Sequence, residues 1–211
     1  HDGVDVVKTG NHLWDQNELY EYLKHHSNII RPANFGADCP RCGVTTFNCN
    51  GHLIAVVNVQ GRVFMKEHVD CPFKAMDTIL SFLKHKTNTI IVDFHAEATA
   101  EKICLGYYLD GRVSCVVGTH THVATADERI LPHGTAYITD LGMSGALNSS
   151  IGMKKDMMIE RFKSQMPHKF VVDTQPPFVM TGVWVEIDTQ TGKAIQINRI
   201  KVIDEDLQAS E

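Results

Sequence analysis

The amino-acid sequence predicts an α/β fold in which a mostly buried sheet carries helices on its faces. Between about residues 53 and 140, apolar segments of strand length alternate with segments of helical periodicity, in the order strand, helix, strand, helix, strand, strand. The chain has 211 residues, of which 43% are hydrophobic and 21% charged, as is ordinary for a globular protein with an apolar core. Because no linker, repeat or low-complexity stretch divides it, residues 1–211 are expected to form a single domain.

Four segments are expected to form helices, and three of them have recognisable boundaries. Asp15 is the expected N-cap of the first helix, because Glu18 follows it three residues later. Pro72 lies in the first turn of the second helix, where a missing N–H costs nothing. Gly111 is expected to end the third. The four segments are residues 14–26, 71–86, 99–112 and 157–166.

The expected strands are apolar or alternating runs that end in polar residues or glycine. The final two runs alternate with period two on either side of the turn "TQTG", so they predict an antiparallel hairpin. Before them, the chain begins with the end of a strand that runs into a loop at Gly10. The other expected strands are residues 52–61, 88–99, 113–122 and 135–145, and the hairpin is residues 177–192 and 193–204.

Charge and composition exclude several classes of protein. The formal net charge of −5 argues against a general nucleic-acid binder, because no broad basic face is implied. No segment approaches the roughly 20 apolar residues that would cross a membrane, and the first residues do not resemble a signal peptide. The six cysteines are scattered, which favours a reduced, cytoplasmic protein.

Polar residues collect where three of the expected strands stop. Asn11 and His12 follow the first strand, His95 ends a second in "VDFHAE", and His120 and His122 end a third in "VVGTHTH". In open α/β sheets, ligands bind at the carboxyl ends of the strands. Four histidines and one asparagine are therefore expected to meet at one site.

The spacing of "HTH" is compatible with metal binding. In an extended segment, residues two apart point the same way, so His120 and His122 are expected to face one site or two adjacent metals. Neutral imidazole is the commonest metal ligand. The pair alone would more often be surface histidines, but His95 and the "GNH" motif, each after its own strand, favour a metal site.

Several motifs resemble one known family. They are "TGNHLWD", "RPANF", "DFHAEATAEK", "VVGTHTHVATADERILPHGTAYITDLGMSG" and the final hairpin, in that order along essentially the whole chain. Together they resemble the YmdB-like branch of the calcineurin-like metallophosphoesterases. The resemblance implies a four-layer α/β/β/α sandwich and a phosphodiesterase with two metal ions, whose substrates are cyclic nucleotides and other small phosphoesters.

The resemblance also implies roles for the strand-end residues. Asn11, His95 and His120 look like ligands to the second metal, and His122 looks like a ligand to the first. His12 looks like the catalytic histidine that assists the leaving group. A hydroxide that bridges two ions about 3.5–4 Å apart would attack phosphorus, and Fe, Mn and Zn all accept such ligands.

One departure from the family pattern leads to further expectations. In the family, a strand ending in Gly-Asp and another ending in Gly-Glu-Asn precede "GNH", whereas this sequence reaches Gly10 almost at once. The domain is therefore expected to be N-terminally incomplete, to bind metal weakly, to be inactive by itself and to form a homo-oligomer through uncovered apolar sheet surface. The alternative function is a degenerate, non-catalytic metallophosphoesterase domain that acts in regulation or assembly.

Secondary roles remain open for a few residues. Asp15 would either cap a helix or orient His12, and Glu97 would either fix a histidine tautomer or support a helix start. Arg31 would contact phosphate or form a structural ion pair. An amidohydrolase-like metal hydrolase is the competing enzyme class, although its H-x-H pair usually comes early in the chain. The "CPRC" stretch is expected to be a loop without function.

Overall fold

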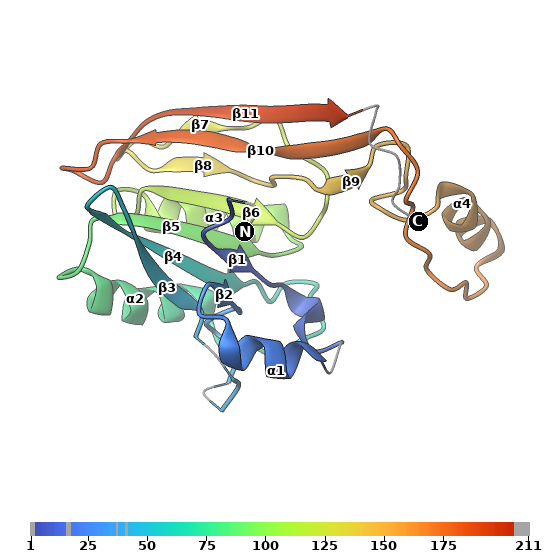
Figure 1. Cartoon of the computed structure of the whole chain (residues 1–211), viewed down its shortest axis with the longest axis horizontal. Coiled ribbons are helices and arrows are strands. Elements are labelled where there is room, and N and C mark those ends of the chain that lie inside the picture. Colours follow the sequence, from blue (N-terminus) through green and yellow to red (C-terminus); the bar gives the residue numbers. More distant parts are fainter. Residues whose placement is uncertain (1–2, 16–17, 37, 41, 205–211) are drawn as a thin grey trace.

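The computed structural model describes residues 3–15, 18–36, 38–40 and 42–204, and it leaves the side chains of Tyr20 and Lys24 undescribed (Figure 1). Its main element is a six-stranded sheet in the order β3-β4-β5-β6-β8-β7. The four central strands are parallel, and β3 and β7 pair antiparallel at the two edges. The strands are β3 (Val44–Cys49), β4 (His52–Gln60), β5 (Thr89–His95), β6 (Cys115–Thr119), β7 (Arg129–Ile130) and β8 (Ala136–Ile138).

Two helices cover one face of this sheet (Figure 1). They are α2 (Pro72–Leu83) and α3 (Thr99–Leu109), and Pro72 occupies the first turn of α2 as predicted. Their apolar residues pack against alternate residues of the strands, such as Val92 and Phe94 of β5, in the largest core cluster. The expected α/β class is therefore confirmed.

A second sheet lies on the opposite face. It has the order β11-β10-β9, and its strands are β9 (Ser144–Ala146), β10 (Phe178–Ile187) and β11 (Ala194–Asp204). β10 and β11 form the predicted antiparallel hairpin. A separate apolar cluster fills the space between the sheets, with Cys115 and Ile138 on one side and Ile197 on the other. The layer of α2 and α3, the six-stranded sheet and this second sheet are thus three of the four expected layers, all within the described residues.

The remaining elements flank the two sheets (Figure 1). β1 (Val7–Lys8) pairs parallel with β2 (Ile29–Ile30), and α1 (Glu18–His25) lies beside them. α4 (Lys155–Ser164) lies apart from both sheets. No helix in the described part of the chain is long and apolar enough to span a lipid bilayer.

Two predicted elements differ from the structure. The expected helix over residues 14–26 is a 3₁₀ helix, η1 (Asn11–Trp14), followed by α1, and Asp15 ends η1 because its N–H bonds to the His12 carbonyl. Asp15 is therefore not the N-cap that the sequence predicted. The expected strand over residues 135–145 divides into β8 and β9, which belong to different sheets.

Candidate metal centre

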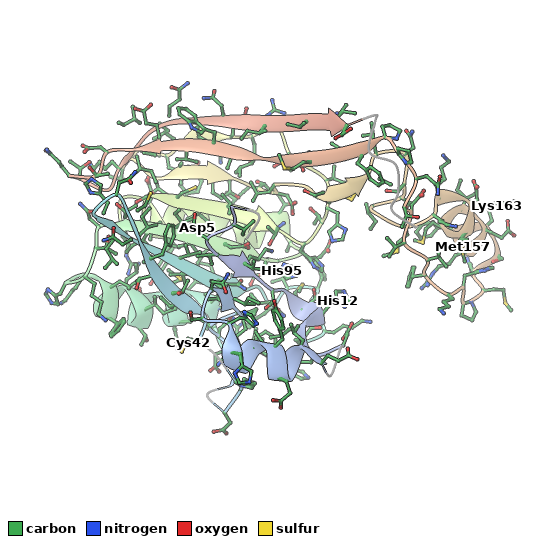
Figure 2. The ribbon with its side chains drawn as sticks, viewed as in Figure 1. Asp5, His12, Cys42, His95, Met157 and Lys163 are labelled. Atoms are coloured by element: carbon green, nitrogen blue, oxygen red, sulfur yellow. The ribbon has the colours of Figure 1, made fainter. Side chains whose placement is uncertain are left out.

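Three strand ends bring the predicted residues to one edge of the larger sheet. His95 is the last residue of β5 and pairs in register with Thr119, the last residue of β6. Asn11 and His12 begin η1 directly after β1, and Figure 2 shows His12 and His95 near each other at this edge. Parallel pairing therefore places the polar termini of separate strands side by side.

Three potential metal donors converge there. The Nε2 atom of His95 lies 2.8 Å from Oδ1 of Asn11 and 3.2 Å from Nδ1 of His120. Donor atoms at about 2.0–2.1 Å from one ion, with angles between about 90° and 109°, lie about 2.8–3.4 Å apart. The separations of His95 from Asn11 and from His120 thus match those expected of ligands that share a cation.

The hydrogen bonds of His95 favour the tautomer that a metal ligand needs. Its Nδ1 lies 3.1 Å from the Thr119 hydroxyl, which donates its own hydrogen to Oδ1 of Asp93 at 2.7 Å. Because the single hydrogen of this hydroxyl goes to Asp93, the hydroxyl can only accept a hydrogen bond from Nδ1–H of His95. The lone pair of Nε2 then faces Asn11 and His120. Lys8 pairs with Asp93 at 3.1 Å and also donates to Thr119. No sequence pattern pointed to Lys8 or Thr119.

His120 lies beside a carboxylate. Its Nε2 atom is 3.1 Å from Oε2 of Glu97, an ion-pair distance, and its Nδ1 atom is 3.2 Å from Nε2 of His95. Burial is the largest cause that lowers the pKa of His120, and the Glu97 carboxylate opposes it. Glu97 thus lies next to the His120 ring, and the two roles considered for it stay predictions.

A glycine makes the approach of η1 to His95 possible. A Cβ atom on Gly10 would lie 2.4 Å from Cε1 of the His95 ring, closer than real atoms approach. The glycine of the "GNH" motif therefore lets Asn11 reach the cluster.

His95 makes folding sensitive to acid. Burial, followed by the nearby Lys8 charge, lowers the pKa of His95 from 6.5 to about 2, so the folded chain holds a neutral ring. Below about pH 6.5 the unfolded chain takes up a proton on this ring, whereas the folded chain does not. The free energy of unfolding therefore has its full value above pH 6.5 and declines as the pH falls. We expect the unfolding free energy of the metal-free protein to fall by about 1.4 kcal/mol per pH unit below 6.5 from this group.

Urea titrations at pH 7 and pH 5.5 check this expectation, with His95→Gln as the comparison because glutamine does not titrate. The pH dependence should be weaker in the variant. Equal dependence in both proteins would show that other groups cause the acid sensitivity.

His12 lies outside the donor cluster. Its side chain is 81% exposed, and its Nδ1–H donates to Oδ2 of Asp15 at 2.8 Å. Asp15 thus orients His12, which is the other role that the sequence left open. The Nε2 atom of His12 remains available at the mouth of the site.

His120 and His122 do not lie in an extended segment. β6 ends at Thr119, and the two histidines have φ angles of +105° and +65°. The prediction that the two side chains point the same way because they lie two apart in an extended strand is therefore wrong. His122 lies apart from the three donors, and its Nδ1–H donates to the carbonyl of Ile151 at 3.0 Å.

The cluster has only two histidines. Over the residues that the structure describes, no group of three or more His, Cys, Asp or Glu side chains has the arrangement of a metal site. Asn11 supplies the third donor, and an amide oxygen is a suitable ligand for Mn²⁺ and Fe²⁺.

A buried ion pair holds the turn between the two histidines. Lys102 of α3 donates to Oδ2 of Asp140 at 2.7 Å, and both side chains are almost fully buried. The same oxygen accepts from the backbone N–H and hydroxyl of Thr121, at 3.1 and 2.7 Å. Asp140 thus fixes the residue between His120 and His122, and it was not among the predicted site residues although it follows an apolar strand.

Breaking this pair should cost stability. We expect Lys102→Met to lower the unfolding free energy by about 3–5 kcal/mol, because it leaves the buried Asp140 carboxylate without its counter-charge. Chemical denaturation measures the loss. Lys163→Met is the matched control, because Lys163 forms an exposed pair with Glu160 and such pairs contribute about 1 kcal/mol or less. Similar losses in both variants would contradict the role of the buried pair.

Arg31 has a structural role. It is buried, and its guanidinium donates to the carbonyls of Pro32, Cys39 and Pro40 at 2.7, 3.1 and 3.0 Å. Three of its five N–H groups are therefore engaged by backbone carbonyls, and no ion pair of Arg31 is present among the described residues. The phosphate contact stays a prediction.

The fold is that of a class of mixed α/β, sheet-rich proteins whose solved members include a phosphatase. The chain belongs to the YmdB-like protein family, whose family model matches residues 1–200. The resemblance inferred from the motifs is confirmed.

Individual relatives agree with this assignment. The chain is 46% identical over 203 residues to the 2′,3′-cyclic-nucleotide 2′-phosphodiesterase of Bacillus subtilis (strain 168), covering 96% of this chain and 76% of that protein. A crystal structure of a hypothetical protein from Thermus thermophilus matches with a TM-score of 0.89 at 37% identity, covering 96% of this chain and 77% of that one. A novel phosphatase from Mycoplasma pneumoniae matches with a TM-score of 0.87 at 34% identity, covering 97% and 74%. The names of two of these relatives denote phosphoester hydrolases, the enzyme class that the sequence predicted.

Proposed function

We propose that this chain is a metal-dependent phosphodiesterase that opens the phosphodiester ring of nucleoside 2′,3′-cyclic phosphates. One observation carries the proposal: Asn11, His95 and His120 come from three strand ends, and their donor atoms lie 2.8 and 3.2 Å apart. The 46% identity to a phosphodiesterase named for this substrate supports the choice of substrate.

The three donors would hold one metal ion, and His122 would serve a second. The neutral His95 ring is in the state that a ligand requires, and the His120 ring lies 3.1 Å from the Glu97 carboxylate. Bound there, the ions would supply a nucleophile at neutral pH and stabilise negative charge on the phosphoryl oxygens.

His12 would act as the general acid. Its exposed Nε2 would give a proton to the departing ribose oxygen, while Asp15 keeps the ring oriented. Opening of the ring at the 2′ oxygen, as the name of the Bacillus subtilis relative states, would leave a nucleoside 3′-phosphate.

Metal removal and restoration test this function. The protein is treated with a chelator, dialysed and assayed with adenosine 2′,3′-cyclic phosphate before and after Mn²⁺ is added, with the product isomer identified by chromatography. With the residues that the family places before "GNH" supplied in the same protein, we expect hydrolysis to depend on the metal and to give the 3′-phosphate. Stoichiometric metal binding without hydrolysis of any cyclic nucleotide would favour the non-catalytic regulatory or assembly module instead.

A further inference from the structure

The loop that follows β4 presents an aromatic ring to solvent. Phe64 is 85% exposed, more than any other large apolar residue described in the chain. Its backbone has a φ of +62°, a conformation that bulky residues rarely adopt. An exposed ring on a strained backbone is a feature found at ligand-binding sites, where the strain is part of how a side chain is presented.

The loop is rigid and is tied to the metal-site residues. The N–H of Gly61 donates to the carbonyl of His95 at 2.9 Å. The carboxylate of Glu101 accepts from the N–H groups of Arg62 and Val63, at 3.0 and 3.2 Å. Gly61 is needed there, because a Cβ atom would lie 2.5 Å from Glu101 Oε2. The position of Phe64 is thus fixed relative to His95.

Phe64 and two of the three metal donors line the same cavity, which has a volume of about 360 Å³. This falls within the range of about 300–1,000 Å³ that is usual for small-molecule sites. Its lining includes Asn11, His12 and His120 from the strand ends and Phe64, Met65 and Lys66 from the loop after β4. The cavity therefore combines polar side chains, suited to a phosphate beside metal ions, with an aromatic ring.

We propose that Phe64 is the base-stacking residue of this site and that it binds the nucleobase of the cyclic nucleotide by its ring face. The inference rests on the proposed function, because the phosphate must lie beside Asn11 and His120 for the base to reach the ring. Every nucleobase has a π face, so stacking tolerates any base, with purines favoured by their larger area. The charged neighbours Lys66 and Glu67 make the surface around the ring polar, which fits a nucleotide better than a second copy of this chain.

If Phe64 stacks on the base, its replacement should raise KM for a substrate that carries a base and leave KM unchanged for a substrate without one. The two substrates are adenosine 2′,3′-cyclic phosphate and methyl ribofuranoside 2′,3′-cyclic phosphate, which has no base. We expect Phe64→Ala to raise KM for the adenosine compound about tenfold, with kcat within about twofold, and to leave the base-free compound unaffected.

Conservative variants separate stacking from simple apolar contact. Phe64→Trp should restore KM for the adenosine compound, whereas Phe64→Leu, which has apolar area but no π face, should not. Phe162→Ala is the matched control, since Phe162 of α4 is 73% exposed and far from the site in sequence. If Phe64→Leu equals the parent, or if Phe64→Ala raises KM equally for both substrates, the inference is overturned.

A binding measurement separates this inference from the proposed function. Adenosine 3′-phosphate should quench the fluorescence of Phe64→Trp beyond any change in the parent, whether or not turnover occurs. Ribose 3-phosphate should not. Absence of this additional quenching overturns the role of Phe64, whereas quenching without hydrolysis of either cyclic substrate supports that role and rejects the proposed reaction.

Discussion

His95→Ala is expected to remove the bound metal and, with it, nearly all phosphodiesterase turnover. The Nε2 atom of His95 is the centre of the cluster, because it lies within 3.2 Å of the donor atoms of both Asn11 and His120. Loss of groups that merely orient a ligand already weakens metal binding by about 10- to 100-fold, so the loss of a ligand should exceed that. Metal stoichiometry by mass spectrometry and turnover with a cyclic nucleotide should both fall.

His120→Ala should likewise lose both the bound metal and the turnover in the same two measurements. His85→Ala is the matched control, because His85 is an exposed histidine just beyond the end of α2. Its removal should change neither metal content nor turnover. A fully metallated and active His95→Ala protein would show that the strand-end cluster is not the metal site.

His12→Ala should separate chemistry from metal binding. We expect kcat to fall by about 10²- to 10⁴-fold, the usual contribution of a general acid, while metal content remains nearly intact. The reason is geometric: Nδ1 of His12 pairs with Asp15 at 2.8 Å, and its ring is 81% exposed and is not one of the three converging donors. Asp15→Asn should have a smaller effect, because it disturbs only the orientation of the ring.

Metal analysis and steady-state kinetics on the same preparations test this separation. A substrate with a good leaving group, such as a nitrophenyl ester, should be less sensitive to His12→Ala because its departing oxygen needs less protonation. If His12→Ala loses metal to the same extent as His95→Ala, His12 is a ligand and not the acid.

The buried part of the fold could be predicted from the sequence, because its signals are local. Pro72 marks the start of α2, Gly111 follows the end of α3 with a φ of +77°, and alternation marks the hairpin of β10 and β11. His95 could be placed at a strand end because β5 is a nearly continuous apolar run.

The rest of the site depends on contacts between distant segments. Lys8 and Thr119 are 111 residues apart in the chain, yet they form one hydrogen-bonded unit with Asp93. The N-cap prediction for Asp15 failed because Asp15 ends η1, with its backbone in the αR conformation and its N–H bonded to the His12 carbonyl. Phe64 had no sequence signal, because a phenylalanine in the sequence is expected to be buried and only the three-dimensional structure shows its exposure.

The positive φ angles of His120 and His122 also restrict how this cluster can evolve. Few side chains accept such a backbone, and asparagine, aspartate and histidine are enriched among those that do. All three offer nitrogen or oxygen atoms to a cation, whereas cysteine and methionine, which soft metals such as Cu(I) prefer, are not among them. Mutation at these two positions can therefore exchange one nitrogen or oxygen donor for another more readily than it can introduce sulfur. A preference for borderline and hard cations would then be inherited through the shape of the main chain, even in descendants whose side chains have changed.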